Sequence, residues 1–204
     1  MTNPLLAVDE LPAFAAIRPE HVTPALDVLL AEAEAALSHA VGSQLPADYD
    51  ALSLALDVPV ERLRTAWGHV GHLQAVADTP ELRAAYADNL PRVIDFSTRM
   101  GSDERLYAKY KAVACSPAAA RLSPARRKAL DDALRDFVLG GAELQGVARE
   151  RFAVIQERCA ALSQQFGEHV LDATDGFALS VQEDELTDVP TDVVQAARQA
   201  AQAA

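Results

Sequence analysis

The chain has 204 residues and a formal net charge of −12, from 30 acidic and 18 basic side chains; half of its residues are apolar and only 5% are aromatic. This length suffices for one sizeable hydrophobic core, and so acidic a surface repels phosphate backbones, so we expect no nucleic-acid partner. The sequence shows neither an export signal nor an apolar stretch long enough to cross a membrane, so we expect no membrane association and a cytoplasmic location.

Alanine dominates the apolar residues. Because alanine loses least on entering a helix, the composition predicts an all-α protein. Residues 1–22 contain three prolines and are predicted to form an extended arm. Thr23 followed by Pro24 is typical of a helix start, and the Ala-rich residues after it predict a first helix. A short helix is expected near residues 48–56, and Pro59 starts a longer one.

The same start signal recurs in the middle of the chain. Thr79, followed by proline, opens a helix whose apolar residues keep helical spacing up to Gly101, and Pro91 inside it predicts a kink. Ser102 is expected to cap a further helix. Ser123, again followed by proline, opens another that ends at a pair of glycines.

The strongest helical pattern spans residues 147–174. Its apolar side chains alternate in steps of three and four residues, which is typical of a helix that packs a narrow seam against antiparallel neighbours. This seam, which we expect to face the core, comprises Phe152, Ile155, Cys159, Leu162 and Phe166. Residues 177–181, FALSV, are predicted to form a short strand, followed by an Ala-rich helix from Thr191 to the end.

Together these elements predict an all-α fold, an antiparallel bundle of about seven helices with one short β-strand near residues 177–181. Three parts are expected along the chain: the extended arm over residues 1–22, the helical bundle over residues 23–176, and the strand with the C-terminal helix over residues 177–204.

Two histidines, His69 and His72, stand three residues apart in a predicted helix, a spacing at which imidazoles can share a metal. A catalytic zinc site usually takes three protein ligands, often two of them in a His-Glu-x-x-His motif. The pair has no glutamate between its members, and none of the five histidines fits the motif. We therefore interpret the pair as packing or surface residues, and an independent metal-binding bundle is the weaker alternative.

No other catalytic pattern is present. Cys115 and Cys159 lie far apart in the sequence and are expected to be reduced core residues rather than nucleophiles. The sequence contains no nucleophile elbow and no phosphate-binding loop, so we assign no catalytic, cofactor-binding or metal-binding residue. The one basic cluster is interpreted as a solvated helix face; it comprises Arg121, Arg126, Arg127 and Lys128.

Five stretches of the sequence nevertheless match something specific. They are MTNPLL at the start, then LPAFAAIRPEHVTPAL, HLQAVADTPELRAAYADNLP and ALRDFVLGGAEL, and finally VLDAT in the long helix. In this order, across nearly the whole chain, they resemble the thimet-oligopeptidase family of zinc metallopeptidases. The resemblance implies a cytoplasmic endopeptidase that degrades short peptides in a deep channel with zinc at its bottom.

Members of that family are much longer, and their zinc motif lies in the C-terminal half, which this sequence does not reach. The resemblance therefore implies an N-terminal helical domain that forms part of the channel wall, holds no zinc, is inactive alone and partners with a missing C-terminal catalytic domain. It also implies that a later segment of the longer chain pairs with residues 177–181. A free-standing helical interaction module, which binds a partner through an acidic face, is the alternative.

Overall fold

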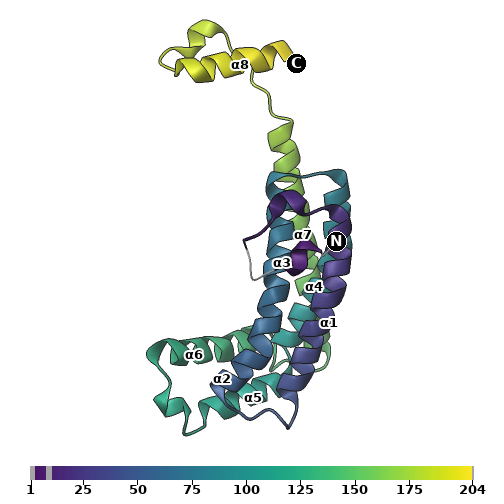
Figure 1. Ribbon diagram of the computed structural model, residues 1–204, viewed down its shortest axis with the longest axis vertical. Helices are drawn as coiled ribbons and strands as arrows, with labels where there is room; N and C mark the ends of the chain where they lie inside the picture. The colour runs from purple at the N-terminus through teal and green to yellow at the C-terminus, as the bar shows by residue number, and fades with distance from the viewer. Residues whose placement is uncertain (1–2, 8–10, 204) are drawn as a thin grey trace. The chain divides into compact units, whose positions relative to one another are not determined.

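The computed structural model describes residues 3–7 and 11–203 (Figure 1). The chain divides into two compact units, residues 1–164 and residues 165–204, and each is described by itself. In the described part of the chain the regular elements are all helical, and there is no strand. This confirms the predicted all-α class.

Seven helices have eleven residues or more within the described ranges, as the sequence predicts. They are α1 (Val22–Val41), α3 (Val58–Val76), α4 (Pro80–Gly101), α5 (Glu104–Ala114), α6 (Pro124–Leu139), α7 (Val147–Asp175) and α8 (Thr191–Ala203). A short helix, α2 (Tyr49–Leu52), continues through a π-helical segment, Ser53–Asp57, directly into α3. The helix α7 begins in the first unit and ends in the second.

The core of the first unit surrounds α1. This helix packs against α3, α4 and α5, and Figure 1 shows α1, α3 and α4 side by side, with α2, α5 and α6 at one end of the bundle. The apolar face of α1 is fully buried, and it includes Val22, Ala25, Leu26, Leu29, Ala33 and Ala40. Across the bundle, Phe96 of α4 and Leu106 of α5 are each 1% exposed.

The N-terminal arm packs on this core instead of remaining simply extended. It contains three single 3₁₀ turns, Pro4–Leu6, Phe14–Ala16 and Pro19–His21, while residues 1–2 and 8–10 lie outside the described residues. Leu5 and Ile17 are buried against the bundle. The arm is thereby held by apolar contacts that its proline content does not reveal.

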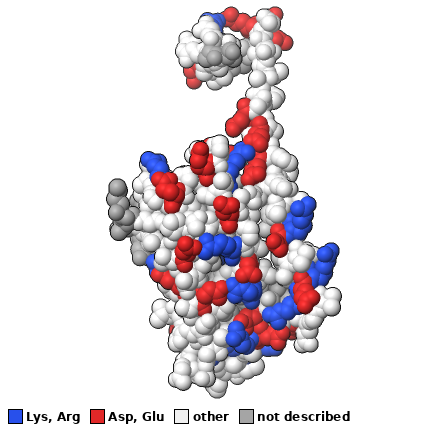
Figure 2. All heavy atoms as spheres, turned by 90° about the vertical axis from the view of Figure 1, so that its right-hand side faces the viewer, with Lys and Arg blue, Asp and Glu red and all other residues white. Residues whose placement is uncertain are grey.

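Ion pairs bridge α1 to its two main neighbours. Asp27 pairs with Arg92 of α4 at 2.6 Å, and Glu34 pairs with Arg99 of the same helix. A third pair, from Arg62 of α3 to Glu32 at 2.7 Å, crosses the other side of α1. Figure 2 shows side chains of both charges interspersed over the face in view, so the acidic excess does not gather there into one patch. Each exposed pair contributes little to stability.

Cap geometry confirms two of the predicted helix starts, whereas two others begin at a different residue than predicted. The side chains of Thr79 and Ser123 accept hydrogen bonds from backbone N–H groups three residues ahead, as the sequence predicts. The cap of α5 is Asp103, not Ser102, because the Asp103 carboxylate accepts from two backbone N–H groups of the first turn. Thr23 lies inside α1, where its hydroxyl instead accepts from Asn89.

The strand predicted at residues 177–181 is wrong. These residues have no regular structure, and two of their apolar side chains are largely exposed, Phe177 at 74% and Leu179 at 72%. A strand needs a partner for its backbone hydrogen bonds, and none exists in the described ranges. The segment leads instead into a 3₁₀ turn, Glu183–Leu186, and then α8, where Arg198 pairs with Glu183 at 2.7 Å.

We expect the Thr79→Ala substitution to lower the free energy of unfolding by about 1 kcal/mol, because it removes the acceptor for the Leu82 N–H at the start of α4. Chemical denaturation measures this change. Thr79→Asp, which keeps a cap acceptor, should recover most of the loss. Equal destabilisation by both substitutions would show that the cap is not the cause.

Candidate functional site

The two histidines with metal-ligand spacing surround an aromatic ring. Both extend from α3, and their imidazole centroids lie 5.4 Å (His69) and 5.0 Å (His72) from the ring centroid of Phe14 in the N-terminal arm. Across the described residues, no group of three or more His, Cys, Asp or Glu side chains is placed to hold a metal ion. The side chains here therefore do not fit the zinc site that the sequence resemblance implies for the longer enzymes.

We predict that the purified chain binds less than about one tenth of an equivalent of zinc and does not cleave peptides, because a catalytic zinc site needs three protein ligands. Elemental analysis after dialysis, together with a quenched fluorescent peptide, checks both expectations. Near-stoichiometric zinc that is lost on His69→Ala would contradict the prediction.

The cysteines and the basic cluster do not form a site either. Cys115 and Cys159 are both exposed, so their predicted core positions are wrong: Cys115 follows the last turn of α5, and Cys159 lies on an uncovered side of α7. Three members of the basic cluster have partners near the start of α6: Arg126 with Asp50, Arg127 with the carbonyl of Ala119, and Lys128 with Asp132. They form a solvated helix face, as the sequence predicts.

The apolar seam of α7 is exposed, which corrects the prediction that it faces the core. Ile155 is 43% exposed, Leu162 46% and Phe166 71%. No residue of α7, all of which the structure describes, is buried. The exposed large apolar residues of α7 within the first unit are Val147, Val154, Ile155 and Leu162, and we call them the α7 face. Helical spacing puts these side chains on one side of the helix, but it does not say what covers them.

The first turns of α7 are attached to the bundle by two residues. The Arg149 guanidinium donates to the Ser102 carbonyl and pairs with Glu104, both at 2.9 Å. The half-buried Phe152 ring lies over Gly141, whose φ of +88° is a conformation that favours glycine. These contacts attach the first turns of α7 to the bundle.

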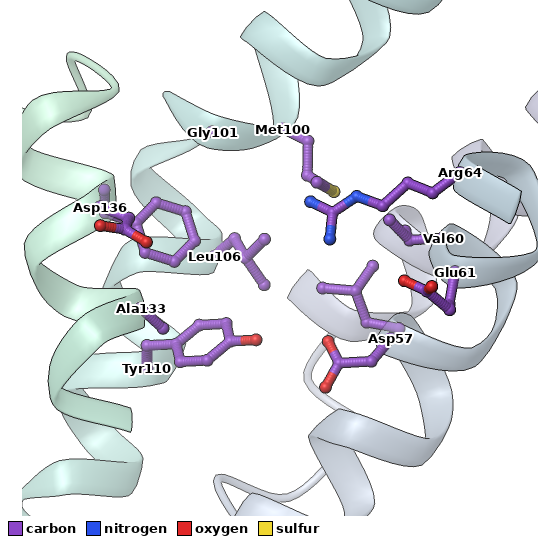
Figure 3. Close-up of a pocket in the computed structure, with 12 residues that line it drawn as sticks. Asp57, Val60, Glu61, Arg64, Met100, Gly101, Leu106, Tyr110, Ala133 and Asp136 are labelled. Atoms are coloured by element: carbon purple, nitrogen blue, oxygen red, sulfur yellow. The ribbon is translucent and has the colours of Figure 1, made fainter. Parts of the chain in front are cut away.

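A pocket of about 380 Å³ lies between the start of α3, the end of α4, and helices α5 and α6 (Figure 3). Its floor is apolar and consists of Leu56, Val60, Leu106 and Phe137, all of which are buried. Met100, at the end of α4, lines it from another side. The size is within the range of small-ligand sites in proteins.

Charged side chains surround this floor. Asp57, Glu61 and Arg64 follow one another at spacings of four and three residues, so α3 and the turn before it present them on one face. Asp136 of α6 adds a third carboxylate opposite them. The resulting rim carries three negative charges and one positive charge. This spacing is visible in the sequence, but sequence reasoning missed it because nothing local shows that α6 faces it.

Two hydrogen-bond donors point into the pocket. Figure 3 shows the Arg64 guanidinium and the Tyr110 hydroxyl both directed toward its open centre. Burial, and secondarily the negative charge of Asp57, raises the pKa of Tyr110, so its hydroxyl stays protonated at neutral pH. The Asp57 carboxylate accepts from the Ser53 hydroxyl at 2.5 Å, which holds it at the edge of the pocket.

Comparisons with known proteins identify the relatives of this chain. Residues 26–149 match the family described as Neurolysin/Thimet oligopeptidase, N-terminal domain. Oligopeptidase A of Salmonella typhimurium is 38% identical over 204 residues, and that of Escherichia coli is 37% identical over the same length. A probable cytosolic oligopeptidase A of Arabidopsis thaliana is 36% identical over 176 residues, 86% of this chain and 25% of the plant protein.

The matched region is a small part of these relatives. It covers 100% of this chain but 30% of each of the two bacterial proteins. In the part of the chain that the structure describes, no helix is both long and apolar enough to span a membrane.

Proposed function

The chain belongs to the family of neurolysin and thimet oligopeptidase N-terminal domains, and from this premise we propose that it is the N-terminal helical domain of a zinc metalloendopeptidase that degrades short peptides. Its bacterial relatives bear the name oligopeptidase A and are more than three times as long as the matched region. In this proposal the zinc and the catalytic groups belong to the remainder of the enzyme, this domain forms part of the substrate-channel wall, and it is not catalytic alone.

The observation that carries the proposal is the exposed α7 face. It keeps four apolar side chains in water along one helix, among them Val147 at 80% exposure. Exposed apolar side chains gathered on one side of a helix favour the binding of another folded surface there. Burying it against the remainder of the enzyme removes that surface from water, which contributes about 25 cal/mol for each Å². The partner of this domain is thus its own catalytic domain.

The proposal extends to where the enzyme works. We place it in the cytoplasm, because one of the plant relatives is named a probable cytosolic oligopeptidase A, although another is named as organellar. The alternative, a free-standing module that binds through an acidic face, receives no support from the face drawn in Figure 2, where both charges are interspersed. The two alternatives differ in the downstream reading frame, which continues into a His-Glu-x-x-His motif only in the proposed enzyme.

A substitution on the α7 face tests the proposal in two forms of the protein. Leu162→Glu should leave the melting temperature of the 204-residue chain within a few degrees of the parent, because the side chain is 46% exposed there. In a longer chain that includes the catalytic domain, the same change should reduce peptide hydrolysis by at least about 10-fold, since it places a charge in a buried interface.

Glu81→Ala, on the exposed side of α4, is the control. It should change neither the melting temperature of the 204-residue chain nor the rate of peptide hydrolysis by the longer chain. If Leu162→Glu has no effect on activity or stability in the longer chain, the α7 face is not the interface. If it unfolds the 204-residue chain, the face is already covered within this domain.

A further inference from the structure

The pocket between α3 and α6 combines three recognition elements that the proposed function does not use. Its floor offers apolar surface from Val60, Leu106 and Phe137. Its rim offers carboxylate acceptors, of which Asp57 and Glu61 stand together on one helix face. Its centre offers two donors, the Arg64 guanidinium and the Tyr110 hydroxyl, as Figure 3 shows. A ligand that satisfies all three must have an alkyl stem, a cationic end and carbonyl acceptors.

We propose that this pocket binds the lysine or arginine side chain of an extended peptide. The alkyl stem of such a side chain lies on Val60 and Leu106, and its charged end reaches the carboxylates of Asp57 and Glu61. Arg64 and Tyr110 then donate to backbone carbonyls of the same peptide. That the ligand is a peptide rests on the proposed function, whereas the preference for a basic side chain rests on the residues that line the pocket.

The charge of the rim decides which charge the ligand must carry. Asp136 is paired with Arg135 at 3.2 Å, so the two carboxylates of Asp57 and Glu61 remain against the one guanidinium of Arg64. The whole chain carries a net charge of −12, so a cation gains from both the local and the overall field. Glu61 and Arg64 make no ion pair within the described residues. By contrast, Arg62 on the same helix is paired with Glu32 of α1. Their charged groups are therefore available to a ligand.

Apolar contact supplies the rest of the selectivity. Long cationic side chains bury their methylene groups on apolar surface while the charged end stays at the rim. A glutamate side chain would gain from Arg64 but would meet the like charges of Asp57 and Glu61, so the net charge of the rim disfavours it. An alanine side chain is too short to cover the apolar floor. The pocket thus distinguishes basic residues from both acidic and small ones.

Three capped alanine hexapeptides provide the test, with lysine, norleucine or glutamate at the third position. Each is titrated into the ¹⁵N-labelled 204-residue chain at low salt, and the amide shifts of residues 100–110 are followed. We expect the lysine peptide to bind at least about 10-fold more tightly than the glutamate peptide and at least about 3-fold more tightly than the norleucine peptide; a factor of 10 corresponds to 1.4 kcal/mol. Raising the salt concentration should weaken the binding of the lysine peptide only.

Paired variants separate charge from shape. Asp57→Asn combined with Glu61→Gln should lower the affinity for the lysine peptide by at least about 10-fold and leave the affinity for the norleucine peptide unchanged. Ala133→Leu, which fills the pocket from α6, should abolish binding of both. Asp88→Asn is an exposed isosteric change on α4 outside the pocket, and it should alter the affinity for neither peptide.

Equal affinity for the lysine, norleucine and glutamate peptides would overturn the proposal. So would saturable shifts confined to other parts of the chain. The peptide comparison with the parent chain decides the matter even if one of the variants fails to fold.

Discussion

Replacing Leu29 by alanine should lower the free energy of unfolding by about 2 to 5 kcal/mol. Leu29 is 0% exposed, on the face of α1 that packs against α3 and α4. The substitution removes apolar contacts and leaves a cavity that tightly packed neighbours fill only in part. Denaturant titration followed by circular dichroism measures the loss.

Leu162→Ala is the matched control, since it makes the same chemical change on the exposed α7 face. It should cost less than about 1 kcal/mol, because its side chain is already 46% exposed. A large loss at Leu162 in a monomeric chain would mean that the α7 face is covered by this chain itself. A small loss at Leu29 would place the core elsewhere.

Replacing Asn89 by alanine should lower the free energy of unfolding by about 2 to 4 kcal/mol, because its side chain is 1% exposed and joins α1 to α4. Its amide nitrogen donates to the Thr23 hydroxyl and to the Ala85 carbonyl, each at 2.8 Å. Its oxygen accepts from the Arg92 guanidinium at 2.8 Å, and Arg92 also pairs with Asp27. The substitution removes three hydrogen bonds of a buried side chain and leaves a space between the two helices, which costs more than the loss of one exposed hydrogen bond.

A double-mutant cycle with Thr23→Val isolates the contact between the two helices. Because Asn89 and Thr23 share one hydrogen bond, we expect a coupling energy of about 0.5 to 1.5 kcal/mol. The exposed neighbour Asp88→Ala should cost less than about 0.5 kcal/mol. Strict additivity of the Asn89 and Thr23 changes would show that this hydrogen bond contributes nothing to stability.

Of the candidate sites, the histidine pair could be interpreted from the sequence, whereas the pocket could not be predicted from it. The interpretation of His69 and His72 as packing residues agrees with their position around Phe14. The pocket was not predicted, because Asp57, Glu61 and Arg64 come from one helix, whereas Asp136 and Phe137 come from another about 75 residues later. Only the tertiary fold, which places the start of α3 across the pocket from α5 and α6, brings their side chains around one space.

The sequence by itself determined some of the helix starts and the class of fold that the helices build. Thr79 and Ser123 cap their helices through hydrogen bonds to residues three positions ahead, so each signal is contained in a few neighbouring residues. Alanine content and helical spacing act over similarly short distances, which is why the all-α class and the long helix α7 were predicted from them.

The tertiary structure alone decided which of those faces are covered. The spacing of Ile155, Leu162 and Phe166 placed them on one side of α7, but their exposure depends on whether another segment lies there. Residues 177–181 have the composition of a strand and form none, because a strand is completed by a partner distant in sequence. Burial and sheet pairing are relations between distant segments, so no local pattern specifies them.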